Sequence, residues 1–254
     1  MIMIRWFNPL VIVIVWSLAP WCVALELPDL VERARPSVVG VGTYEALRAP
    51  RYVLAGTGFV VGHGRHVITN YHVARGQGDL TEKIQLVVFL GRGKTPDVRR
   101  AKLVAQDRFH DLAVLEMEGA PGPALSLGDA DTAREGQAIA IIGFPIGAIL
   151  GLYASTNAGI VSSISPIAMP QATTQTLSAE QIRRLREPFE VFQLDVIAYP
   201  GNSGSPVFEV RTGHVIGVVN SVLARTSKEG LLKDPSAITY AIPIRHVQKL
   251  LEGL

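Results

Sequence analysis

The sequence predicts an all-β protein of two halves, each with about six short strands that form a barrel or a sandwich. Short Val-rich segments recur along the chain, and glycines and charged turns separate them. The 24 glycines and 16 prolines are scattered without a period, so turns interrupt the chain throughout. No regular alternation of strands with helices supports a parallel sheet.

The strands are expected in two sets, separated by a connection at 119–135. In the first half we expect strands at 37–43, 58–61, 66–69, 84–90, 101–105 and 112–117. In the second half we expect strands at 138–142, 159–164, 192–195, 206–209, 214–222 and 239–242. The connection has no periodic apolar pattern. The predicted domains are therefore 25–118 and 136–254.

Three short helices accompany the strands. At 27–35, Leu27, Leu30 and Val31 share one face and Pro36 ends the helix. A second helix is expected at 178–185, where Ser178 and Gln181 have the spacing of a capping box. The third is an amphipathic helix at 245–251.

Composition excludes several classes of protein. Of the 254 residues, 48% are hydrophobic and 18% charged, which excludes a disordered chain and a coiled coil. The net charge of +2 and the lack of a basic stripe argue against a nucleic-acid partner. The single cysteine, Cys22, excludes a cysteine-ligated metal site and an internal disulfide.

Residues 1–24 have the pattern of a signal peptide. Arg5 precedes an apolar run at 10–16, and cleavage fits after Ala24. The protein is therefore expected to be exported, to a periplasm or outside the cell. The alternative is an uncleaved membrane anchor at 6–25, about the ~20 residues that a bilayer span needs, although Pro9 and Pro20 weaken it.

The strongest chemical motif is the sequence Gly-Asn-Ser-Gly-Ser-Pro at 201–206. A serine between glycines lies on a turn that can expose its hydroxyl and bring backbone N–H groups together. Acyl transfer needs this combination of a nucleophilic oxygen and oxyanion donors. Ser203 is the candidate nucleophile, and Gly201 and Ser203 are the natural N–H donors of an oxyanion loop that includes Asn202.

Two further motifs supply partners for this serine. His72 follows an apolar strand and a short turn, where an imidazole can face a cleft as a general base. Asp111 opens another apolar strand, and a partly buried carboxylate there needs a partner such as an imidazole. The chain order His72, Asp111, Ser203 matches the chymotrypsin arrangement. It also divides the site between the two halves, where clefts commonly form.

The motifs together resemble one family over nearly all of residues 27–254. They occur in its order at 56–60, 68–74, 111–115, 127–129, 158–162, 193–195 and 240–243. The sequence is similar to the trypsin-like serine proteases of the HtrA (Deg) type. This resemblance implies two packed six-stranded antiparallel barrels of the chymotrypsin-like fold. It also implies hydrolysis of polypeptide substrates through an acyl-enzyme, with no metal and no cofactor.

The same resemblance assigns roles to the site residues. His72 is the implied base, Asp111 orients it, and Ser203 is the nucleophile. Misfolded or particular envelope proteins are the implied substrates, and a homotrimer is common in the family. Near the start of the mature chain expected after residue 24, Tyr44 and Tyr52 are the aromatic candidates for a trimer contact.

Several features depart from the family pattern. Ser205 stands where the family usually has glycine, and the family's Asn-Pro-Phe-Gly turn is replaced at 143–147. The segment 148–155 is longer than usual, and 165–190 has the character of an insertion. No peptide-binding PDZ domain is expected in this chain. Because Asn202 has no charge to pair with a freed N-terminus, activity is not expected to require one particular processed terminus.

Substrate preference is predicted from residues near the nucleophile. Ile197 lies where a charge selective for Lys or Arg side chains would stand, and with Val218, Val219 and Ala241 it predicts a pocket for small or medium aliphatic side chains. Asp195 is a rival selectivity charge, although the resemblance favours a structural carboxylate there.

Three other functions remain to be weighed. A catalytically silent, chaperone-like binder of unfolded polypeptides would follow if the altered loops left the oxyanion hole collapsed. An esterase is disfavoured because its nucleophile usually lies on a strand–turn–helix in an α/β sheet. A membrane-bound interaction domain would need an uncleaved 6–25 and would not explain the three motifs.

Overall fold

The computed structural model describes residues 25–76, 83–93, 95–145, 152–166, 187–220 and 238–254. The predicted signal peptide at 1–24 and the predicted helix at 178–185 lie outside the described residues. Within the described ranges, no helix is long and apolar enough to cross a bilayer.

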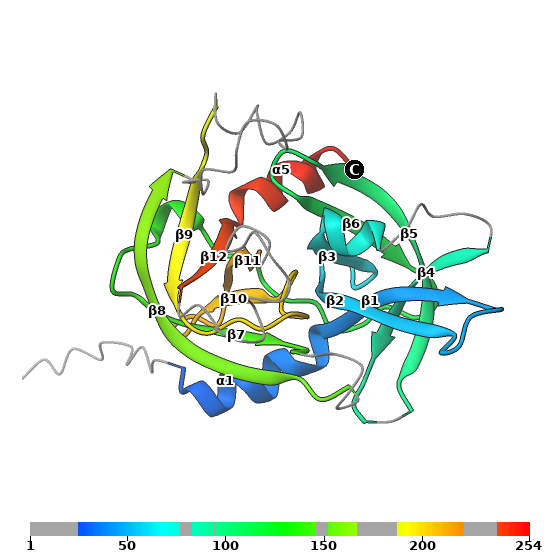
Figure 1. Ribbon diagram of the computed structural model, residues 1–254. Coiled ribbons are helices and arrows are strands. Elements are labelled where there is room, and N and C mark those ends of the chain that lie inside the picture. Colours follow the sequence, from blue (N-terminus) through cyan, green and yellow to red (C-terminus); the bar gives the residue numbers. More distant parts are fainter. Residues whose placement is uncertain (1–24, 77–82, 94, 146–151, 167–186, 221–237) are drawn as a thin grey trace, which may run out of the picture.

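The strands of the described residues form two closed antiparallel barrels, side by side (Figure 1). The first contains β1 (Val38–Glu45), β2 (Tyr52–Val61), β3 (His66–Asn70), β4 (Ile84–Leu90), β5 (Asp97–Asp107) and β6 (Leu112–Met117). The second contains β7 (Ala138–Gly143), β8 (Ser155–Pro166), β9 (Glu190–Asp195), β10 (Pro206–Glu209), β11 (Val215–Val219) and β12 (Ile238–Pro243). The predicted fold class of two six-stranded barrels is confirmed.

Strand order follows the same pattern in both barrels. Neighbours run β1-β2-β3-β6-β5-β4 in the first and β10-β11-β12-β9-β8-β7 in the second. Each barrel closes through a long-range pair, β1 with β4 and β10 with β7. Closure leaves no unpaired sheet edge for aggregation.

An apolar core extends across both barrels. Phe59 and Leu112 of the first barrel belong to the same buried cluster as Ile141, Phe208 and Val218 of the second. A second cluster, with Val39 and Leu115 among its members, fills the remainder of the first barrel. The shared cluster gives the two barrels a common apolar interface, which holds them in contact.

The described short helices are α1 (Leu27–Ala34), η1 (Arg35–Ser37), α2 (Tyr71–Arg75), η2 (Ala130–Thr132) and α5 (Arg245–Glu252). In Figure 1, α1 and α5 lie on opposite sides of the two barrels. Arg245 of α5 donates to Asp131 at 2.7 Å and to Glu190 at 2.9 Å, and Gln248 donates to the Gly128 carbonyl at 3.1 Å. The last helix therefore joins the connecting segment to the second barrel.

The segment between the barrels contacts both of them. Leu125 forms an isolated parallel bridge with Val61 of the first barrel, and Leu127 forms one with Val215 of the second. Met117 ends the last strand of the first barrel and Ala138 begins the first strand of the second.

Candidate active site

Backbone hydrogen bonds to Asp111 fix the position of His72. β3 ends at Asn70 and α2 begins at Tyr71, so His72 lies in the first turn of a helix. The Tyr71 N–H donates to the Asp111 carbonyl at 3.1 Å, and the His72 N–H donates to Asp111 Oδ1 at 2.9 Å. Orphan N–H groups of the helix start are thus satisfied by a residue from another strand.

The side chains of His72 and Asp111 form a close pair. His72 Nδ1 lies 2.6 Å from Asp111 Oδ2, and the His72 side chain is 33% exposed while that of Asp111 is 12% exposed. A carboxylate accepts hydrogen bonds, so Nδ1 carries the proton and Nε2 is left as the acceptor. This tautomer is the one that a general base requires.

Hydrogen bonds from several neighbours fix both the backbone and the side chain of Asp111. Its backbone has φ 57°, in the left-handed region that non-glycine residues rarely adopt. The Asn70 Nδ2 donates to its carbonyl at 3.1 Å, and the Asn220 Nδ2 donates to Oδ2 at 2.7 Å. Asn220 follows β11 of the second barrel, so the carboxylate is fixed from both barrels.

The Ser203 turn depends on two glycines with positive φ. Gly201 has φ 100° and Gly204 has φ 86°. A Cβ on Gly204 would lie 2.0 Å from the Thr57 carbonyl oxygen, so no other residue fits there. The Gly204 N–H donates to the Val219 carbonyl at 2.9 Å, which fixes the turn to β11.

The nucleophile turn lies against the first barrel. The Thr57 N–H of β2 donates to the Ser203 carbonyl at 2.9 Å. A Cβ on Gly56 would lie within 2.9 Å of both the Val73 side chain of α2 and that same carbonyl. The structure therefore brings the helix that carries His72 next to the turn that carries Ser203.

Two backbone N–H groups of this turn are the predicted donors for an oxyanion. Neither the Gly201 N–H nor the Ser203 N–H donates a hydrogen bond to the described part of the chain. Ser203 is 6% exposed, so these groups lie at the edge of the protein interior. Unpaired N–H groups of this kind are what an oxyanion site offers to a developing negative charge.

The polar side chains beside Ser203 are buried and have no hydrogen-bond partner among the described residues. Toward the described residues, neither amide atom of Asn202 forms a hydrogen bond, and neither does the Ser205 hydroxyl. Asn202 is 1% exposed and Ser205 is fully buried. A Cβ on Gly143 would lie 2.0 Å from Ser205 Oγ, so the serine occupies the space that a side chain at 143 would need.

The predicted pocket residues divide into two groups. Val218, Val219 and Ala241 are fully buried, and Val219 pairs with Ala241 between β11 and β12. Ile197, after β9, is 38% exposed. Their role as a substrate pocket stays a prediction, as does the selectivity role of Asp195, which is exposed at the end of β9.

Sequence reasoning missed two side chains of the site. Asn220 binds the carboxylate of Asp111, and the Thr57 hydroxyl donates to the Gly201 carbonyl at 2.7 Å. Both are polar residues next to apolar or glycine-rich strand sequence, a signal that could have marked them as buried polar groups in need of partners.

A cluster of aromatic rings includes His110, the residue that precedes Asp111 in the sequence. The rings of His110 and His246 stack at 3.8 Å, and His110 Nδ1 lies 2.5 Å from Asp107 Oδ2. Burial, together with the nearby charges of His110 and Arg245, lowers the pKa of His246 to about 4. Burial of Asp107 acts to raise its pKa, but the hydrogen bonds from His110 outweigh this effect and the pKa is lowered.

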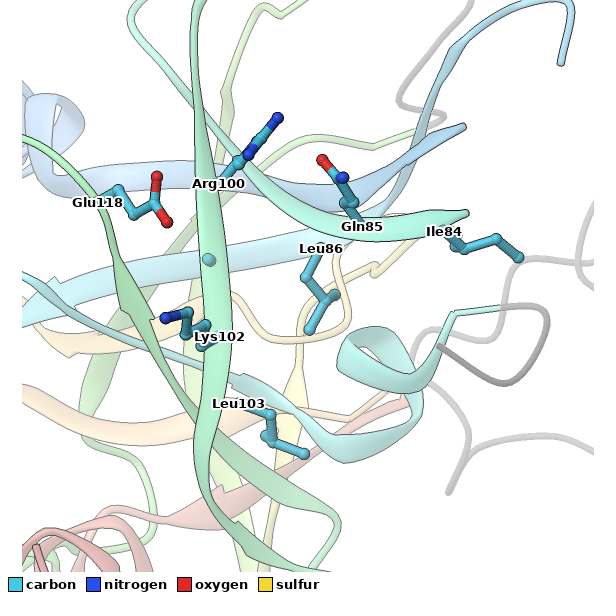
Figure 2. A pocket seen from close by; sticks show the side chains of 8 residues that line it. Ile84, Gln85, Leu86, Arg100, Lys102, Leu103 and Glu118 are labelled. Atoms are coloured by element: carbon cyan, nitrogen blue, oxygen red, sulfur yellow. The ribbon is translucent and has the colours of Figure 1, made fainter. Parts of the chain in front are cut away.

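Other features of the described residues lie apart from the site. A hollow of about 360 Å³ lies beside β4 and β5. Its lining includes Leu86, Arg100 and Lys102, whose side chains are labelled in Figure 2. It contains none of the predicted site residues. Among the described residues, no group of three or more His, Cys, Asp or Glu side chains could hold a metal ion.

Tyr44 and Tyr52, the predicted trimer candidates, pack on each other with ring centroids 4.9 Å apart. Tyr52 also meets Phe89 edge to face at 6.0 Å. Their contacts with each other and with β4 account for part of their surface, and their role in assembly stays a prediction.

Comparison with known proteins identifies similar chains. Residues 56–218 match the family model described as trypsin-like peptidase domain. A relative from Halomonas elongata, named probable periplasmic serine endoprotease DegP-like, is 33% identical over 74% of this chain and 32% of its own length. The serine protease Do-like HtrB of Bacillus subtilis is 29% identical over 94% of this chain and 49% of its own length.

A solved structure of the HtrA-type protease AlgW with tripeptide has 26% identity and a TM-score of 0.62, covering 89% of this chain and 62% of its own. The chain thus spans about a third to a half of the curated relatives described here.

Proposed function

This chain belongs to the family of trypsin-like peptidases, and we propose that it is a serine endopeptidase that hydrolyses peptide bonds of proteins in the cell envelope. The observation that carries the proposal is the 2.6 Å pair of His72 and Asp111, in a barrel whose Thr57 N–H binds the Ser203 carbonyl of the other barrel. Relatives named periplasmic serine endoproteases support both the reaction and the compartment. The signal-peptide pattern at 1–24 supports the compartment independently.

The proposed reaction begins with Ser203. Its Oγ attacks the carbonyl carbon of the scissile bond while His72 Nε2 takes the hydroxyl proton. The Asp111 carboxylate stabilises the imidazolium that forms and keeps the ring oriented. The N–H groups of Gly201 and Ser203 bind the oxyanion of the tetrahedral intermediate.

The intermediate then collapses and the C–N bond breaks. The leaving amine receives the proton from His72, and Ser203 is left as an acyl ester. Water attacks the ester carbonyl, with His72 again taking a proton and returning it to Ser203 Oγ. The products are a carboxylic acid and an amine, and the chain returns to its starting state.

Quality control or processing of envelope proteins is the proposed setting. The endoprotease names of the relatives and the tripeptide bound in the AlgW structure support a polypeptide substrate for this chain. Assembly as a homotrimer belongs to the same proposal, as does the preference for small or medium aliphatic side chains. The barrels disfavour an esterase of the α/β-hydrolase type, whose nucleophile needs a different turn.

The test is covalent labelling of the purified chain with a fluorophosphonate, read by intact mass beside a Ser203→Ala variant. The probe requires an activated serine but no knowledge of the substrate. We expect one adduct on the wild type, none on the variant, and cleavage of an unfolded protein such as casein by the wild type alone. A folded wild type that takes no adduct and leaves casein intact contradicts the proposal and favours the chaperone-like binder.

A further inference from the structure

Thr57 is a buried polar residue of the first barrel at its contact with the nucleophile turn. It lies within β2, between Gly56 and Gly58, and is fully buried. Its N–H donates to the Ser203 carbonyl at 2.9 Å, and its carbonyl accepts from the Thr69 hydroxyl at 2.7 Å. The backbone on both sides of the Thr57 side chain is therefore fixed.

The hydroxyl of Thr57 connects two segments of the second barrel. It donates to the Gly201 carbonyl at 2.7 Å and accepts from the Phe144 N–H at 3.0 Å. A carbonyl can only accept and an N–H can only donate, so the single hydroxyl proton has one arrangement that satisfies both partners. Thr57 and Phe144 are buried, so water cannot freely replace a bond that the Thr57 hydroxyl loses.

This arrangement determines the plane of one peptide in the nucleophile turn. The Gly201 carbonyl and the Asn202 N–H belong to the same peptide unit. The first accepts from Thr57, and the second donates to the Tyr199 carbonyl at 3.0 Å. With this plane anchored on both sides, the φ (100°) and ψ angles of Gly201 together set the direction of the Gly201 N–H.

The side chains within the turn contribute no such anchor. The Asn202 amide and the Ser205 hydroxyl are buried and have no hydrogen-bond partner among the described residues. The anchor of the Gly201 carbonyl is thus a side chain contributed by the opposite barrel, 144 positions away in the sequence.

We propose that the Thr57 hydroxyl is a positioning group for the oxyanion site: by holding the Gly201 carbonyl, it aims the Gly201 N–H at the developing oxyanion. The inference rests on the serine peptidase function proposed above. Thr57 does not touch the reacting atoms. It acts through the Gly201 peptide, and it makes the oxyanion site dependent on correct docking of the first barrel.

The test compares Thr57→Val, which has the shape of threonine without its hydroxyl, with Thr57→Ser, which keeps the hydroxyl. A Thr239→Val control removes another buried hydroxyl, which lies outside the Ser203 turn. That hydroxyl donates to the Val196 carbonyl at 2.5 Å. The measurements are the second-order rate constant of fluorophosphonate labelling, the final labelled fraction, and kcat and KM for a peptide substrate.

We expect Thr57→Val to lower the labelling rate constant and kcat by at least about tenfold, since loss of a direct oxyanion donor costs about 10²- to 10³-fold. The labelled fraction, KM and the pH profile of labelling should be unchanged, because the His72–Asp111 pair is not altered. Thr57→Ser should stay within about threefold of the wild type, a rescue that a packing role would not give.

Three outcomes overturn the inference. A Thr57→Val variant that labels at the wild-type rate shows that the hydroxyl does not position the turn. A rate loss equal to that of Thr239→Val, or a loss only in labelled fraction, shows a purely structural role. If the folded wild type takes no label, the proposed peptidase function fails, and this inference fails with it.

Discussion

The two halves of the candidate site are held by different kinds of interaction. On the first barrel, the Asp111 carboxylate accepts from the His72 N–H, from His72 Nδ1 and from Asn220. On the second, the described contacts of the Ser203 turn run through its backbone and through glycines, while the neighbouring Asn202 and Ser205 side chains have no described partner. Changes to the charge and hydrogen bonds of Asp111 should therefore disable the first half. The second half should respond to added volume at its glycines and to loss of the Thr57 hydroxyl bond to the Gly201 carbonyl.

The largest expected effect is that of Asp111→Asn, which breaks the first half. Asparagine tolerates the φ of 57° at this position, so the fold should be retained. An amide in place of the carboxylate no longer holds His72 in the tautomer with its proton on Nδ1. We expect kcat for a peptide substrate to fall by about 10³- to 10⁴-fold.

The matched control for this change is Asp97→Asn. Asp97 is an exposed residue paired with Arg99 on β5 and lies outside the site. Its kcat should equal that of the wild type. An Asp111→Asn enzyme with more than a tenth of the wild-type kcat would show that this carboxylate does not orient the base.

The second change tests the second half by volume alone. Gly143→Ala places a Cβ 2.0 Å from Ser205 Oγ and 2.9 Å from Asn202 Oδ1. Overpacking of this kind costs about 1–3 kcal/mol, which should appear as a lower midpoint of urea unfolding and slower labelling of Ser203. Ser205→Gly should restore more than half of the loss when the two changes are combined.

Gly122→Ala is the control for a glycine with space around it, because its Cβ would meet nothing closer than 3.5 Å. Its midpoint should match the wild type. Strict additivity of Gly143→Ala and Ser205→Gly would show that the two positions do not share one space, contrary to this reading of the turn.

A smaller effect is expected for Asn220→Ala. The carboxylate of Asp111 loses one hydrogen bond but keeps both bonds from His72. A hydrogen bond to a charged group contributes about 1.5–3 kcal/mol, so kcat should fall by at least about tenfold with KM nearly constant. Gln248→Ala, which removes an amide that binds the Gly128 carbonyl, should leave kcat unchanged. A change confined to KM would instead place Asn220 in substrate binding.

The smallest expected effect concerns pH and the ring cluster behind Asp111. The pKa of His246 is lowered from 6.5 to about 4, and the groups around it are His110, Asp107, Arg245 and Lys249. The unfolded chain therefore takes up this proton at a higher pH than the folded chain does. Stability is then lost as the pH falls from about 6.5 to about 4, and above that window the contribution is constant.

Urea midpoints between pH 7.5 and 4.5 would measure this loss, with His246→Phe as the comparison. The phenylalanine keeps a ring in the stack and cannot be protonated, so its midpoint should depend less on pH. The lowered pKa of Asp107 acts only below its ordinary value of 3.8 and does not disturb this window. Parallel pH curves for the two proteins would show that His246 does not titrate in this way.

Much of the fold could be predicted from local pattern. β4, β6 and β10 have the predicted bounds because each is an apolar run with turn residues on both sides. β2 begins at Tyr52 rather than at residue 58. Its first part lies at the exposed end of a hairpin, where Tyr52 pairs with Tyr44. That part lacks the alternation of buried and exposed residues by which a sequence indicates a strand. β5 extends over charged residues such as Arg99 for the same reason. The resemblance to HtrA (Deg) proteases is confirmed by the matching family and relatives.

From the sequence, only those candidate site residues that belong to recognisable motifs could be predicted. His72, Asp111 and Ser203 each carry local sequence that indicates a role, and the structure brings the first two into contact. The roles of Asn220 and Thr57 depend on partners 109 and 144 positions away, which no local pattern contains. Such contacts exist only after the two barrels have packed together.

The division of the site between two barrels has a consequence for the life of the chain before it is folded. A polypeptide that grows from its N-terminus completes the first barrel, which carries the proposed base His72, before the second barrel, which carries the proposed nucleophile Ser203. The second barrel closes only when β12, its last strand in sequence, pairs with β9 and β11. With those roles, a copy whose β12 is not yet made or folded holds no active serine, so it cannot digest itself or its neighbours during synthesis.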